Sequence, residues 1–160
     1  VELVGYGTSA DAYHLTAGPE DGDGARRAMM AALAQAGIQA ADVQHLNAHA
    51  TSTTVGDRGE LAAIKRVFGD DNQIAVTSTK SATGHLLGAA GGIEAIFTAL
   101  AIRDQRVPAT RNLQQPDPLA DGVDIVRGAA RDMRIEHAIC NGFGFGGVTA
   151  SVLFKRWQGA

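Results

Sequence analysis

The chain has 160 residues and a formal net charge of −3, with 45% hydrophobic and 19% charged residues. This balance is typical of a globular domain, and no stripe of basic residues indicates a nucleic-acid partner. The single cysteine, Cys140, excludes an internal disulfide and fits a reducing, cytoplasmic compartment.

The first half of the chain alternates apolar, strand-like runs with helical patterns. Apolar runs bounded by glycine or polar residues predict strands, and apolar residues three or four positions apart predict helices. The expected elements are a strand over 1–8, a polar loop over 9–24, a helix over 25–36, a strand over 43–47, a helix over 56–68 and a strand over 74–78.

Residues 84–103 predict one long helix that is apolar on nearly every face. A bilayer-spanning helix needs about 20 apolar residues, and here Glu94 and Thr98 interrupt a shorter run. We therefore expect a core helix buried between two sheets and no membrane segment. A buried carboxylate requires a compensating partner, so Glu94 should have one.

The last part of the chain predicts two strands, 135–140 and 148–154, joined by a glycine-rich turn over 141–147. Glycines that bind a dinucleotide lead from a strand into a helix, whereas these lead into a strand, which excludes that role. The turn can still offer backbone N–H groups to an oxyanion. The alternation of strands and helices predicts the α/β class with an antiparallel final pair.

Three segments gather the candidate functional groups: residues 47–53, 78–85 and 141–147. They contain His49 and His85 on separate strand-end loops, with Lys80 before the second histidine. Such groups beside a glycine-rich loop suit a site that holds a developing oxyanion. Cys140 lies inside a strand with no activating neighbour in sequence, so we expect a small buried side chain there.

These segments, together with Asp-Ala-Tyr-His-Leu-Thr at 11–16, resemble the carboxy-terminal motifs of the β-ketoacyl-acyl-carrier-protein synthases, most closely the elongating enzymes. The resemblance implies a thiolase-like fold of two similar halves, each a mixed sheet with a buried central helix and covering helices. Residues 1–160 would form the second half. The nucleophilic cysteine would lie in the amino-terminal half, since this chain, which does not begin with Met, has the appearance of a piece of a longer polypeptide.

The resemblance implies decarboxylative condensation of an acyl thioester with a malonyl thioester. His49 and His85 would be the catalytic pair, each donating an N–H to the enolate oxygen. Lys80 would be the motif lysine and Glu94 its partner. We expect this pair to fix His85 and the local field rather than to act as acid or base.

Further roles follow from the same resemblance. Phe145 would be the gate beside the acyl pocket, and its backbone N–H would contribute to the oxyanion hole for the acyl thioester. Thr51 and Thr53 would bind the pantetheine arm, with Thr16 and Phe143 also contacting substrate. No metal or separate cofactor is implied, because the phosphopantetheine arm belongs to the substrate.

The expected partners are an acyl carrier protein, the amino-terminal half of the same enzyme and a second copy in a homodimer. Thiolases and chalcone-synthase-like enzymes are alternatives, but they use Cys-His-Cys or Cys-His-Asn sites. A ketosynthase of a polyketide synthase usually has Gly-Thr-Gly-Thr after the first histidine, where this chain has Ala-Thr-Ser-Thr. The non-catalytic alternative is a chain-length factor, in which the motif histidines tend to be lost.

Overall fold

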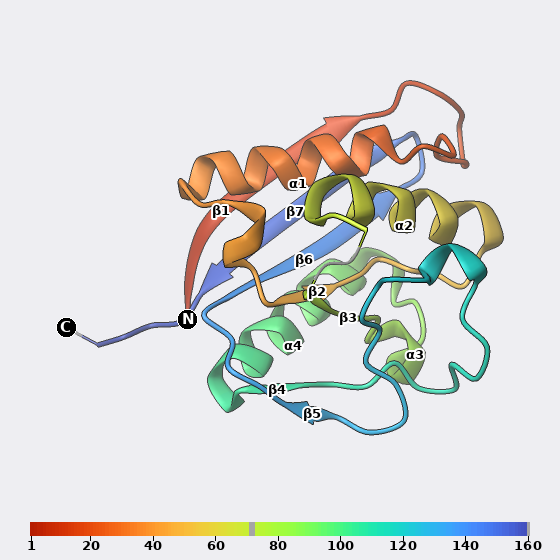
Figure 1. Ribbon diagram of the computed structural model, residues 1–160. Coiled ribbons are helices and arrows are strands. Elements are labelled where there is room, and N and C mark those ends of the chain that lie inside the picture. The colour runs from red at the N-terminus through yellow and green to blue at the C-terminus, as the bar shows by residue number, and fades with distance from the viewer. Residues whose placement is uncertain (71–72, 160) are drawn as a thin grey trace.

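A mixed five-stranded sheet organises the computed structural model, which describes residues 1–70 and 73–159 (Figure 1). The strand order is β1-β7-β6-β2-β3, and a separate two-stranded ribbon pairs β4 with β5. The strands are β1 (Glu2–Ala10), β2 (His45–Asn47), β3 (Ala75–Thr77), β4 (Arg106–Val107), β5 (Arg131–Asp132), β6 (His137–Gly144) and β7 (Val148–Lys155). The predicted α/β class with its mixed sheet is confirmed.

The direction of the strands brings the three candidate segments to one edge of the sheet. β2 runs parallel to both β3 and β6, whereas β7 runs antiparallel to β6 and to β1, as expected for the final pair. The carboxyl ends of parallel strands meet at the same edge. The segments that follow β2 and β3 therefore lie beside the end of β6, although they are far apart in sequence.

Helices cover both faces of the sheet. They are α1 (Asp23–Ala36), α2 (Thr54–Phe68), α3 (Lys80–Thr83) and α4 (Ala90–Asp104), with short 3-10 turns at Ala40–Asp42, Leu87–Ala89 and Pro118–Ala120. Side chains alternate between faces along a strand. Accordingly Ile139 packs in the core beneath α1 and α2, while Ala138 and Cys140 pack in the core against α4. Figure 1 shows these helices on opposite sides of the sheet.

Glycine permits an unusually close contact between β1 and α1. A Cβ atom at Gly7 would lie 2.1 Å from the backbone oxygen of Ala28, and one at Gly5 would lie 2.2 Å from that of Ala32. Backbone atoms cannot move aside as a flexible side chain can. The two glycines thus set the distance between α1 and β1, the outermost strand of the sheet.

The predicted single helix over 84–103 is wrong in its first part. The chain forms the short helix α3, turns at Gly84 with a φ of 76° and at Leu87 with a φ of 51°, and only then enters α4. Left-handed residues cannot continue a right-handed helix. The expected burial of α4 between two sheets is not seen among the described residues: α4 contacts β6 on one side, while Ile96 on its other side is 58% exposed.

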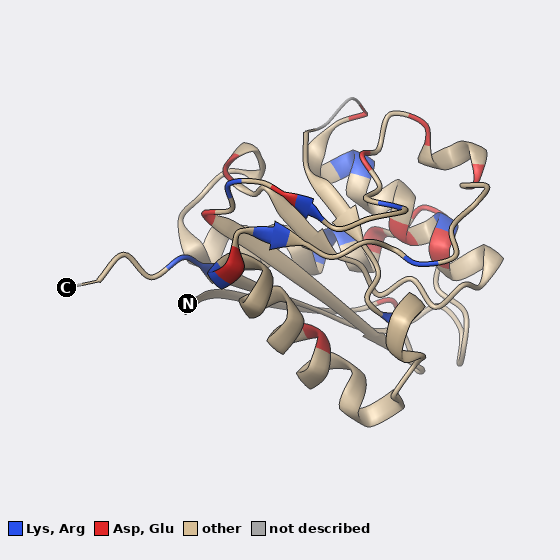
Figure 2. Ribbon diagram, turned by 90° about the horizontal axis from the view of Figure 1, so that it is seen from below, with Lys and Arg blue, Asp and Glu red and all other residues tan. Residues whose placement is uncertain are grey.

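The surface mixes charges of both signs. Figure 2 shows basic and acidic residues close together around the β4–β5 ribbon, where Arg106 pairs with Asp132 and Arg131 with Asp124. Within residues 1–70 and 73–159, no helix is both long enough and apolar enough to cross a membrane.

We predict that Gly7→Ala destabilises the protein by about 1–3 kcal/mol, because the new methyl group forces α1 away from β1. The matched control is Gly18→Ala, whose Cβ would lie 3.6 Å from Asp11, an ordinary contact distance. Urea unfolding followed by circular dichroism measures both variants. Equal stability of Gly7→Ala and wild type would show that the close contact can relax without cost.

Candidate active site

His49 lies just beyond β2 with its ring orientation fixed by the backbone. Its Nδ1 atom accepts the Phe143 N–H at 3.2 Å, so the ring proton is on Nε2. Burial, the charge of Lys80 and the neighbouring His85 lower the pKa of His49 to about 3. The ring is therefore neutral near pH 7 and presents an Nε2–H donor.

His85 has the same arrangement on the next loop. Its Nδ1 atom accepts the Leu87 N–H at 3.3 Å, which again leaves the proton on Nε2. The left-handed turns at Gly84 and Leu87 flank the histidine and shape its loop. The His49 and His85 rings meet edge to face with centroids 5.5 Å apart. The fold thus joins two histidines that are 36 residues apart in sequence.

Lys80 and Glu94 form a buried ion pair beside the histidines. The Lys80 Nζ and Glu94 Oε1 atoms are 2.6 Å apart, and the two side chains are 4% and 3% exposed. Lys80 begins α3 and Glu94 lies in the second turn of α4, so the pair links the two helices. The predicted partnership is confirmed, and it explains a carboxylate within an apolar helix.

A second buried acid, Glu60 on α2, was not predicted from the sequence. Its carboxylate accepts the backbone N–H groups of His49 at 2.9 Å and Ala50 at 2.8 Å, and the Asn141 side-chain amide at 3.0 Å. Burial raises the pKa of Glu60, although these hydrogen bonds and the charge of Lys80 act in the opposite direction. Glu60 therefore holds the loop that carries His49.

A signal for Glu60 was present in the helical pattern. Glu60 falls on the buried side of α2 together with Ala63 and Ile64, as an i, i+3, i+4 set. An acid on the apolar face of a helix needs hydrogen-bond donors. The argument that predicted a partner for Glu94 therefore also predicts hydrogen-bond donors for Glu60. It does not identify these donors.

The turn between β6 and β7 is shorter than expected, because β6 continues through Gly144. Only the last part of the segment, residues 145–147, connects the two strands, and it places the Phe145 side chain 80% exposed. Phe143 remains in β6, and its ring lies 5.1 Å from that of His49.

The predicted substrate-binding threonines fall on two different loops. The Thr51 and Thr53 hydroxyls lie 3.2 Å apart on the loop after His49. Thr16 lies on the loop after β1, and this loop meets the Phe145 turn, since the Gly146 N–H donates to the Leu15 carbonyl at 2.7 Å. Seven of the nine predicted catalytic and substrate-binding residues thus lie on loops or strand ends around one edge, while Lys80 and Glu94 reach it from α3 and α4.

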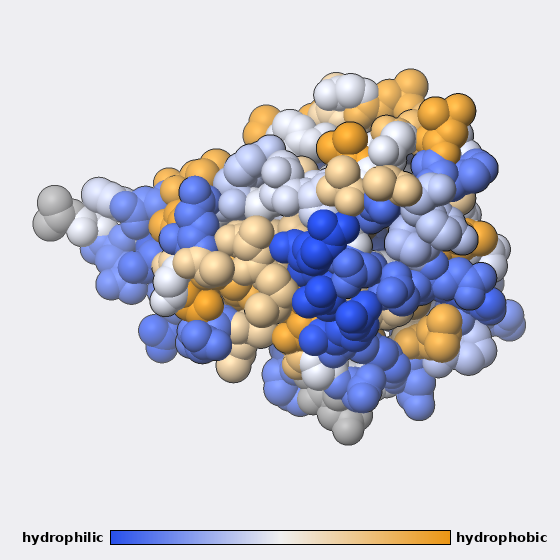
Figure 3. Space-filling view, turned by 90° about the horizontal axis from the view of Figure 1, so that it is seen from above, coloured by the Kyte–Doolittle hydropathy of each residue, from blue (hydrophilic) through white to orange (hydrophobic). Residues whose placement is uncertain are grey.

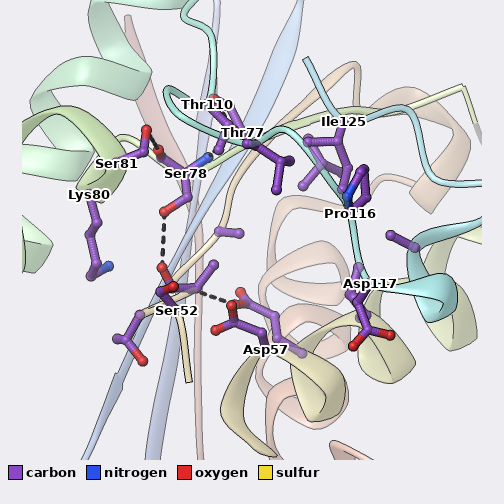
Figure 4. Close-up of a pocket in the computed structure, with 18 of the residues that line it drawn as sticks. Ser52, Asp57, Thr77, Ser78, Lys80, Ser81, Thr110, Pro116, Asp117 and Ile125 are labelled. Atoms are coloured by element: carbon purple, nitrogen blue, oxygen red, sulfur yellow. Dashed lines mark hydrogen bonds between the residues drawn. The ribbon is translucent and has the colours of Figure 1, made fainter. Parts of the chain in front are cut away.

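A cavity of about 470 Å³ adjoins this edge (Figure 4). Thr51, Lys80 and His85 contribute to its lining, together with α2 and the segment 110–125. Figure 4 shows Lys80 and Ser78 on one side of the cavity and Asp57 on another. Such a volume is typical of a small-molecule site.

The remaining candidate groups are structural. Cys140 is buried in β6, and burial raises its pKa to about 12, so the thiol is inert as predicted. His45 is fully buried with Nδ1 donating to the Ala75 carbonyl, and Nδ1 of His137 lies 3.0 Å from the Asp42 carbonyl. Among the described residues, no cluster of three or more His, Cys, Asp or Glu could hold a metal ion.

The family model of the beta-ketoacyl synthase, C-terminal domain, matches residues 1–114. This match covers most of the chain, which therefore belongs to the beta-ketoacyl synthase C-terminal domain family. The chain is 54% identical over 158 residues to 3-oxoacyl-[acyl-carrier-protein] synthase 2 of Staphylococcus aureus strain COL, covering 98% of this chain and 38% of that protein. It is 52% identical over 159 residues to the Rhizobium meliloti strain 1021 protein of the same name, covering 99% of this chain and 37% of that protein.

Solved structures agree on the thiolase-like fold. A beta-ketoacyl synthase from Burkholderia phymatum STM815 matches with a TM-score of 0.90 and 35% identity over 98% of this chain and 37% of that chain. A ketosynthase in complex with its type II polyketide acyl-carrier protein matches with a TM-score of 0.90 and 35% identity over 98% and 38%. The ishigamide ketosynthase/chain length factor matches with a TM-score of 0.92 and 33% identity over 98% and 38%.

We predict that Glu94→Ala destabilises the protein by about 3–5 kcal/mol, because it leaves the Lys80 ammonium buried without a counter-charge. The control is Asp104→Ala. Asp104 pairs with Arg103 at the same 2.6 Å distance, but both side chains are at least half exposed. Chemical unfolding should detect no change in the control, since water screens exposed pairs. A mild effect of Glu94→Ala would mean that water reaches the Lys80 side chain.

Proposed function

We propose that this chain is the carboxy-terminal catalytic half of an elongating 3-oxoacyl-acyl-carrier-protein synthase of fatty-acid synthesis. The observation that carries the proposal is the pair of histidine rings, His49 and His85, meeting beside the buried Lys80–Glu94 ion pair. The chain spans 38% of the length of its Staphylococcus aureus relative. The remainder of the enzyme would supply the nucleophilic cysteine.

The proposed reaction is decarboxylative Claisen condensation. The bond between the malonyl carboxylate and its α-carbon breaks, carbon dioxide leaves, and the electron pair forms an enolate. The Nε2–H groups of His49 and His85 donate to the enolate oxygen, which stabilises the charge as it develops. The enolate carbon then attacks the acyl thioester, and the cysteine thiolate leaves.

The Lys80–Glu94 pair has a supporting role in this proposal. Its charges are already paired and buried, so neither group is available as a free acid or base. Lys80 contributes positive potential, which helps to keep His49 unprotonated. His49 thus stays a neutral donor rather than becoming an imidazolium ion.

The substrate contacts follow from the loops around the edge. The Phe145 backbone N–H would join that of the cysteine in an oxyanion hole for the acyl thioester, with the Phe145 ring as gate. Thr51, Thr53, Thr16 and Phe143 would contact the phosphopantetheine arm and the malonyl group. No metal and no separate cofactor take part.

Several exposed apolar residues suit contact with another protein surface. Leu15, Leu87, Ile96 and Phe145 are between 58% and 80% exposed. Figure 3 shows one face of the molecule, on which separate hydrophobic patches surround a central hydrophilic region. Large exposed apolar areas mark contact surfaces. We propose that the amino-terminal half covers part of this surface, and that the complete enzyme is a cytoplasmic homodimer that binds an acyl carrier protein.

A polyketide ketosynthase is the second candidate, favoured by the likeness to the ishigamide and hexaketide-bound structures. The fatty-acid function has the better support, since the identity to the 3-oxoacyl synthases is 54% against 33–35% for these structures. A non-catalytic chain-length factor is less well supported, because both motif histidines are present and paired.

In the complete enzyme, we predict that His49→Ala and His85→Ala each lower malonyl decarboxylation by about 10²–10³, because each removes one donor to the enolate oxygen. Acyl transfer to the cysteine should suffer less, since it uses the backbone oxyanion hole. Single-turnover assays of the two steps separate these effects. Normal decarboxylation in both variants would refute the proposed mechanism.

We also predict that the 160-residue chain alone does not condense acyl and malonyl thioesters, because its single thiol, Cys140, is buried and protonated. The assay uses purified chain free of complete enzyme, with Cys140→Ser as control. Cysteine-dependent turnover would place the nucleophile within this chain and contradict the proposal.

A further inference from the structure

One fully buried amide connects the separate parts of the site. Asn47 ends β2, two residues before His49, and its side chain turns toward α3 and α4 rather than toward the histidine rings. In the sequence, Asn47 is the first residue of the segment 47–53.

The orientation of the amide is fixed by its partners. The Oδ1 atom accepts the backbone N–H of Thr79 at 3.3 Å, and the Nδ2 atom donates to the Glu94 carbonyl at 3.3 Å. An N–H can only donate and a carbonyl can only accept, so the oxygen and nitrogen ends cannot be exchanged. Nδ2 also donates to the Thr79 and Thr98 hydroxyls at 3.1 and 3.3 Å.

The bonded atoms belong to both sides of the buried ion pair. Thr79 directly precedes Lys80, and the accepting carbonyl is that of Glu94 itself. A shift of the Thr79 backbone would carry Lys80 with it, and a shift of the second turn of α4 would carry Glu94. Asn47 is also only two positions before His49 in the chain. The low pKa of His49 depends partly on its distance from the charge of Lys80.

We propose that Asn47 is a positioning residue, whose side-chain amide sets the place of the Lys80–Glu94 pair relative to the two histidines. The inference rests on the proposed function for its kinetic test. Asn47 is 0% exposed and so does not reach substrate. Its effect must therefore pass through Lys80 and Glu94.

The test uses Asn47→Ala in the complete enzyme, with malonyl decarboxylation as the assay. We expect kcat to fall by about 10-fold to 100-fold through misplacement of the charged pair, with the KM for the malonyl thioester nearly unchanged. In a Lys80→Met background the same substitution should cause little further loss, because the group on which it acts is already gone. A role in stability alone would lower the unfolding midpoint without this dependence on Lys80.

The matched control is Thr98→Val, which removes one hydrogen bond to Asn47 and leaves those to Thr79 and Glu94. We expect its kcat to stay close to that of wild type. If Asn47→Ala does not fold, Thr79→Val replaces it. That variant loses the hydroxyl contacts but keeps the N–H bond, and a smaller fall in kcat is expected.

Unchanged kcat in Asn47→Ala, or in Thr79→Val where it replaces that variant, would overturn the inference. An equal loss with and without Lys80 would also overturn it. A failure of the proposed function would give a different result: the wild-type complete enzyme itself would not decarboxylate the malonyl thioester. The inference about Asn47 would then also be wrong.

Discussion

The rest of the site depends on the need to neutralise Lys80 inside the protein. An ammonium that is almost inaccessible to water requires a counter-charge within contact distance. Glu94 satisfies this need only because α4 packs on the sheet against β6. The position of the helix, the turn before it and the loop bearing His85 are therefore linked to one electrostatic requirement, and the field felt by His49 follows from it.

Two acids on different helices organise the two histidine loops in different ways. Glu94 acts through a side-chain charge, whereas Glu60 acts on the backbone, by accepting the N–H groups of His49 and Ala50. The backbone amides of Phe143 and Leu87 then fix the ring protons on Nε2. Both rings thereby present an Nε2–H donor, as the proposed stabilisation of an enolate without reorganisation requires.

Most of the strands, α1, α2 and the pairing of Lys80 with Glu94 were predictable, because they follow from periodicity and from the cost of burying a charge. The break before α4 was not, because Leu87 gives no sequence signal for its left-handed φ of 51°. The donors to Glu60 are backbone groups of His49 and Ala50, which only the tertiary fold brings to it. Sequence spacing likewise gave no reason for the two histidines to meet.

The inert state of Cys140 has a consequence for chemical probes. Electrophiles such as iodoacetamide and chloroacetamide react with thiolates, and a thiol with a pKa of about 12 in a buried strand presents almost none near neutral pH. In the folded protein, Cys140 therefore does not react with such reagents. In a larger protein that contains this chain, any cysteine that such a reagent modifies would therefore lie in the remaining sequence. Cys140 would not have to be replaced before the experiment.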